Sequence, residues 1–96
     1  MVDVLTREDF LPRVGETFRV GETGTDLVLT EAASLAARGA SAGPRRAPFS
    51  LLFRGPKPVL PQRTWALENE ALGRLEIFLV PIGADADGVR YEAIFN

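Results

Sequence analysis

The chain has 96 residues, of which 46% are hydrophobic and 25% are charged, and these proportions fit one small globular domain rather than a disordered chain. Cysteine and histidine are both absent, which excludes disulfides, thiolate or imidazole metal sites, cysteine nucleophiles and histidine bases. The net charge of −2 lacks the basic excess that nucleic-acid binders usually carry, so no nucleic-acid partner is expected.

The N-terminal segment is not typical of a targeting sequence. Residues 1–10 carry charged side chains and lack the apolar stretch of a signal peptide. The longest apolar run, residues 77–82, is far too short to span a membrane. A soluble cytoplasmic protein without membrane contact is therefore expected.

One short helix or 3₁₀ turn is predicted over residues 7–14. Thr6 can cap its N-terminus, and Asp9 occupies the third helical position of a capping box. Pro12 disrupts the hydrogen-bond ladder of any longer helix, and Gly15 ends the segment.

After Gly15 the sequence is typical of short β-strands. Phe49, Leu51 and Phe53, for example, alternate with other residues so that they share one face of a strand. The two-glycine loop 21–25 and the Asp87-Gly88 pair are good hairpin signals, whereas the proline-rich segment 55–61 cannot lie inside a sheet. The predicted strands span residues 16–20, 26–33, 48–54, 63–68, 74–82 and 89–95.

Residues 34–47 are the hardest segment to assign. Residues 34–38 alone could form a helical turn, because alanine and leucine favour it. The glycine, serine and proline residues that follow are typical of loops, so we predict a flexible loop over residues 34–47.

Six strands joined mostly by short turns predict a mainly β fold. No predicted helix is long enough to connect parallel strands, so the sheet is expected to be antiparallel. The expected architecture is a small six-stranded antiparallel barrel or barrel-like sandwich, with the short N-terminal helix at one end and residues 1–96 in a single domain.

Several strands carry apolar residues on both faces, which is unusual for a sheet that has one face in water. Two explanations are open. The N-terminal helix or a second sheet layer could cover the second face, or that face could bind another protein or a second copy of the chain. On the 74–82 strand Phe78, Val80 and Ile82 lie opposite Leu75, Ile77 and Leu79, and Leu52 and Ile94 repeat the pattern elsewhere.

A basic group follows the predicted loop. Arg45 and Arg46 close the loop, and Arg54 and Lys57 are near in sequence. Arginine presents a rigid fork of donors, so the group could receive a phosphate or an acidic partner. Solvated charge at the end of a loop is the simpler explanation.

Acidic residues give no clear chemical motif. Asp85 and Asp87 are only a fragment of a calcium loop, and a hairpin turn is sufficient to explain them. Glu76 and Glu92 could be cross-strand neighbours, but Arg74 and Arg90 share their face, so ion pairing is simpler than catalysis.

Other chemical signals are also weak. Glu68 and Glu70 are further carboxylates without an evident partner, and the lone Trp65 is expected in the core or at its rim. No phosphate loop or dinucleotide motif is present, so no catalytic residue, metal site or cofactor is predicted.

Five segments are distinctive as a set, and they are residues 5–10, 48–55, 60–62, 78–83 and 91–96. Taken together, they resemble a family of short, uncharacterised bacterial proteins classed as a domain of unknown function. The resemblance implies a stand-alone domain with no assigned activity, associated with neighbours that look like phage-tail collar proteins.

The leading hypothesis is a non-enzymatic protein-interaction or structural module, with a phage-tail-like assembly as its setting. The alternative is a small-ligand binder that uses the mouth of the barrel and the Arg45–Arg46 loop. A hydrolase or lyase that uses glutamates is a third hypothesis. The residues predicted for the interaction surface are Arg45, Arg46, Leu52, Arg54, Phe78, Val80 and Ile94.

Overall fold

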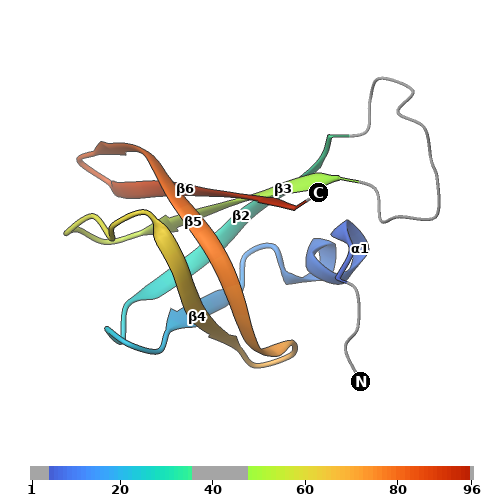
Figure 1. Ribbon diagram of the computed structural model, residues 1–96. Coiled ribbons are helices and arrows are strands. Elements are labelled where there is room, and N and C mark those ends of the chain that lie inside the picture. The colour runs from blue at the N-terminus through green and yellow to red at the C-terminus, as the bar shows by residue number, and fades with distance from the viewer. Residues whose placement is uncertain (1–4, 36–47, 96) are drawn as a thin grey trace.

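The computed structural model describes residues 5–35 and 48–95, and these residues form two short helical turns and six strands (Figure 1). The helix α1 spans Arg7–Phe10 and continues as the 3₁₀ turn η1, Leu11–Arg13. The strands are β1 Thr17–Val20, β2 Asp26–Ser34, β3 Phe49–Gly55, β4 Arg63–Asn69, β5 Gly73–Asp85 and β6 Gly88–Phe95.

The six strands form one antiparallel sheet that closes on itself in the order β1-β2-β3-β6-β5-β4. The four-residue strand β1 makes the closure, because Phe18 pairs with Leu27 of β2 while Val20 pairs with Leu67 of β4. The predicted mainly β, six-stranded antiparallel fold with one short N-terminal helix is therefore confirmed.

The local signals at the N-terminus act as expected. The Asp9 carboxylate accepts a hydrogen bond from the backbone N–H of Thr6 at 2.8 Å, which is the reciprocal half of a capping box. The α-helix lasts only one turn and tightens into η1 where Pro12 occurs, since proline cannot donate to the helical ladder. Glycine at position 15 follows with a φ of 94°.

The core fills the inside of the closed sheet. Alternate residues of each strand point inward, and most of them are fully buried. Their apolar side chains supply the main driving force for folding. The buried apolar residues of the strands are Phe18, Val20, Leu27, Leu29, Ala32, Phe49, Leu51, Phe53, Trp65, Leu67, Ile77, Leu79, Val89, Tyr91 and Ala93.

Aromatic rings close the end of the sheet beside α1. Phe10 is fully buried, and its ring centroid lies 6.4 Å from that of Phe18, 5.9 Å from that of Phe49 and 5.8 Å from that of Phe95. Phe49 and Phe95 stack on each other at 4.7 Å. The helix thus contributes one aromatic anchor to the core.

The proline-rich connection between β3 and β4 lies at the opposite end (Figure 1). The backbone N–H of Leu60 donates to the hydroxyl of the fully buried Tyr91 at 2.8 Å. The indole N–H of Trp65 donates to the Pro61 carbonyl at 2.9 Å. The side chains of Tyr91 and Trp65 thus form hydrogen bonds with the backbone of this connection, whose prolines exclude it from the sheet. Trp65 itself belongs to the core.

Removing the Tyr91 hydroxyl should therefore weaken the domain. We expect Tyr91→Phe to lower the free energy of unfolding by about 1–3 kcal/mol, because the buried N–H of Leu60 loses its acceptor. Urea denaturation measures the change. The control Thr30→Val removes an exposed hydroxyl that donates to the Leu52 carbonyl, and it should cost less than about 0.5 kcal/mol. Equal midpoints for the two variants would contradict this account.

The structure extends strands β2 to β6 beyond their predicted limits, β5 by the most. Ser34 belongs to β2 rather than to a loop, and the N–H of Leu35 still donates to the Pro48 carbonyl at 2.9 Å. β5 continues to Asp85, after a register shift between Pro81 and Gly83. The rest of the predicted 34–47 loop, residues 36–47, lies outside the described residues.

The hairpin between β5 and β6 is tighter than expected. Asp85 pairs directly with Gly88, which leaves a two-residue turn of Ala86 and Asp87. Gly88 has a φ of 131°, and a Cβ at this position would collide with the carbonyl oxygen of Gly55. Glycine is therefore required here by both conformation and space.

Among residues 5–35 and 48–95, no helix combines the length and apolar character needed to cross a membrane.

Candidate interaction surface

Four apolar side chains lie together on the outside of the closed sheet. They come from the adjacent strands β3, β6 and β5, and we call them the outer apolar face. Phe78 is 50% exposed and Ile94 is 48% exposed, whereas Leu52 and Val80 are half-buried. Monomeric proteins rarely leave several large apolar side chains together in water without an interaction to explain them.

The strand register brings these residues together from distant parts of the sequence. Leu52 of β3 and Val80 of β5 both lie directly opposite Glu92, on the two sides of β6. Ile94 lies two residues further along β6, and Phe78 lies two residues before Val80 on β5, so both share the same face.

In the part of the chain that the structure describes, neither the N-terminal helix nor a second sheet layer covers this face. α1 lies at one end of the sheet (Figure 1) and packs against β2. Its buried Phe10 belongs to the core. The six strands form one closed layer, so only their inner face is enclosed. Ile82, at the register shift in β5, is also 48% exposed.

Charged side chains border the outer apolar face near the β5–β6 turn. Arg54 and Arg90 lie directly opposite each other on β3 and β6. Arg90 Nη1 donates to Asp85 Oδ2 at 2.8 Å, while Arg54 Nη1 lies 4.0 Å from Asp87 Oδ2. The turn thus supplies one aspartate for each arginine.

The aspartates of this turn have a structural role. The backbone N–H of Asp87 donates to Asp85 Oδ1 at 2.8 Å, which confirms that these residues form a hairpin turn. This hydrogen bond, and then the Arg90 guanidinium, hold the pKa of the Asp85 carboxyl below its ordinary value.

The predicted surface is only partly brought together by the structure. Arg54 lies at the border of the outer apolar face, but Lys57 is exposed in the connection that follows β3. Arg45 and Arg46 lie outside the described residues, so the basic group predicted around them stays a prediction.

The glutamates do not form the predicted cross-strand pair. Glu76 lies opposite Ala66 of β4, whereas Glu92 lies opposite Val80 of β5, because the two-residue hairpin shifts the register of β6. Glu76 instead lies 3.8 Å from Arg74. Glu68 and Glu70 are exposed near the β4–β5 turn.

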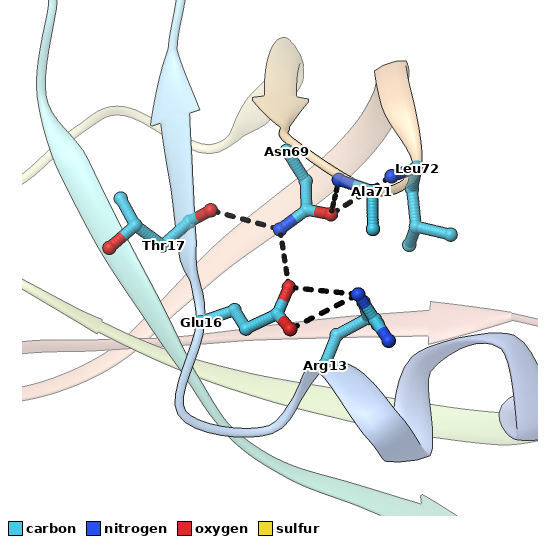
Figure 2. A network of polar contacts seen from close by, with 6 residues as sticks. All are labelled: Arg13, Glu16, Thr17, Asn69, Ala71 and Leu72. Atoms are coloured by element: carbon cyan, nitrogen blue, oxygen red, sulfur yellow. Dashed lines mark hydrogen bonds and ion pairs between the residues drawn. The ribbon is translucent and has the colours of Figure 1, made fainter.

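Sequence reasoning missed a polar network centred on Asn69 (Figure 2). Asn69 is only 5% exposed, and its amide nitrogen donates to Glu16 Oε1 at 3.2 Å and to the Thr17 carbonyl at 3.1 Å. Its amide oxygen accepts the backbone N–H groups of Ala71 and Leu72, each at 2.9 Å.

Arg13 completes this network. Its Nη1 lies 3.1 Å from Glu16 Oε2, so the segment after η1 is tied to the β4–β5 turn. A surface hollow of about 460 Å³ lies beside these residues. Because the polar groups of the network bind one another, we assign it a structural role. Its sequence signal is a single asparagine at the end of a strand, which is also a common turn residue.

The described residues thus define a class: a small closed antiparallel β domain with an exposed apolar face on three neighbouring strands. The chain belongs to the family described as a domain of unknown function, DUF6916, whose model matches residues 5–95. No curated protein and no solved structure matches the chain.

Proposed function

We propose that this domain is a protein-interaction module and that its partner binds the outer apolar face. The observation that carries the proposal is the half-exposed state of Phe78 and Ile94 on neighbouring strands of a sheet whose core is already complete. Burial of such side chains by a partner removes apolar surface from water and favours association.

The closed sheet indicates how a partner would bind. The strand order is closed, although β1 pairs with only Asp26–Val28 of β2 and with Leu67 and Glu68 of β4. We propose recognition through the side chains of the outer apolar face rather than through a strand edge, so a single substitution in that face should have a large effect.

The setting that we propose is a bacterial, cytoplasmic, phage-tail-like assembly. This part of the proposal rests on the family resemblance. The small-ligand alternative depends on Arg45 and Arg46 outside the described residues, and no observation here favours it over a protein partner.

The test is capture of partners from lysate of the native host with wild-type and variant baits. We expect Phe78→Asp to reduce retention of a wild-type partner at least tenfold, because a charge would be placed in the centre of the apolar contact. Quantitative mass spectrometry measures the retention.

Val14→Asp is the matched control, since Val14 is 44% exposed but lies beside η1 rather than on the outer apolar face. Both variants should keep the wild-type thermal midpoint. Partners retained equally by all three baits, or no partner whose retention depends on Phe78, would argue against the proposed function.

A further inference from the structure

One carboxylate lies among the apolar side chains of the outer face. Glu92 of β6 has Leu52 on one side and Val80 on the other as its directly opposite neighbours, and Ile94 follows two residues along its own strand. The side chain is half-buried. Glu92 is therefore surrounded on three sides by apolar residues.

This carboxylate has no hydrogen bond or ion pair within residues 5–35 and 48–95. The nearby arginines of the same face are engaged elsewhere: Arg90 binds Asp85 at 2.8 Å, and Arg54 lies closest to Asp87. Among residues 5–35 and 48–95, Glu92 is consequently an acceptor with no protein partner.

A partner that covers the outer apolar face removes much of that water. Burial of a carboxylate without a counter-ion makes the free energy of binding less favourable. Burial of a carboxylate that pairs with a cation can instead contribute to both affinity and specificity. A second copy of this chain, related by a twofold axis that passes close to Glu92, would bring two Glu92 carboxylates together. Charge complementarity therefore disfavours self-pairing and favours a partner with the opposite charge.

From this arrangement, and resting on the proposed function, we infer that the partner is a different protein whose contact surface places one lysine or arginine among apolar side chains. The cation binds Glu92, and the flanking apolar groups contact Phe78, Val80 and Ile94. Glu92 acts as the specificity-determining residue of the face, because an apolar partner without a cation would leave it unpaired.

The test uses three soluble peptides that share apolar residues on both sides of one variable central residue, which is lysine, glutamine or glutamate. Titration into ¹⁵N-labelled protein, followed by NMR, gives both the binding site and the affinity. For the wild type we expect shifts centred on the amides of residues 78, 80, 92 and 94. The lysine peptide should bind about three- to tenfold more tightly than the glutamine peptide.

Glu92→Gln should reduce this preference to less than about twofold, because it removes the charge and keeps the shape of the side chain. Glu76→Gln is the matched control, since Glu76 is an exposed carboxylate of β5 that already lies near Arg74. It should leave the lysine preference unchanged. Both variants should retain the dispersed amide spectrum of the folded wild type.

Three results would overturn the inference in different ways. Equal affinities of the three peptides, with shifts on the outer apolar face, reject the cation while the proposed function stands. A wild-type dimer in sedimentation velocity that Phe78→Asp dissociates identifies a second copy as the occupant instead. Absence of shifts on this face with every peptide also rejects the inference, and the capture experiment then decides the proposed function separately.

Discussion

Phe10→Ala should destabilise the domain by about 3–5 kcal/mol, the range found when a buried phenylalanine is truncated in a well-packed core. Phe10 is fully buried and contacts the rings of Phe18, Phe49 and Phe95, so its removal leaves a cavity among three other aromatic side chains. Small domains are stable by only about 5–15 kcal/mol in total, so this one change removes a large fraction.

Urea denaturation monitored by circular dichroism measures the loss. Leu11→Ala is the matched control, because Leu11 is the next residue along the chain and is 40% exposed. It should cost less than about 1 kcal/mol. Similar losses for the two variants would show that Phe10 is not the anchor that its contacts indicate.

Asn69→Asp should destabilise the domain by a comparable amount, about 3–5 kcal/mol, which is typical of an uncompensated buried charge. The amide nitrogen of Asn69 donates to Glu16 Oε1 and to the Thr17 carbonyl, and a carboxylate oxygen at that place can donate to neither. It would instead lie beside the carboxylate of Glu16 and repel it. The loss is measured as the shift in the denaturation midpoint at pH 7.

A double-mutant cycle separates this repulsion from a general effect of the substitution. Adding Glu16→Gln to Asn69→Asp should restore at least about 1 kcal/mol, because the neutral amide can donate to the new carboxylate. Glu70→Gln is the control, since Glu70 is exposed and adjacent in sequence. Strictly additive effects of the two substitutions would mean that Glu16 and Asn69 do not interact as the structure shows.

The fold could largely be predicted from the sequence, because its strongest signals are local. The two-residue alternation of Phe49, Leu51 and Phe53 identifies one strand, and Asp87-Gly88 identifies one hairpin. Pro12 limits the helix to a short turn, as the change from α1 to η1 shows. Each of these signals depends on residues within a few positions of one another.

The candidate surface was only half predictable. Alternation shows that Phe78 and Val80 share a face, but it contains no information about what covers that face, so both explanations had to stay open. Pairing across strands depends on the register. The position of the two-residue turn at Ala86 and Asp87 places Val80, rather than Glu76, opposite Glu92.

The Asn69 network was not predictable for the same reason. Asn69 and Glu16 are 53 positions apart in the sequence, and nothing local to either residue indicates the other. Glu92 was recognised as a carboxylate on a strand, yet its isolation among apolar side chains depends on Leu52 and Val80 from two other strands.

The closure of the sheet by β1 and β4 also has a kinetic consequence. Val20 must find Leu67 across a long intervening chain, and the entropy lost in closing such a loop is offset only when the other strands are largely in place. Proteins dominated by distant pairings fold in milliseconds to seconds rather than microseconds. During that interval both strands of the seam have unsatisfied backbone groups, and misassembly between chains would start there.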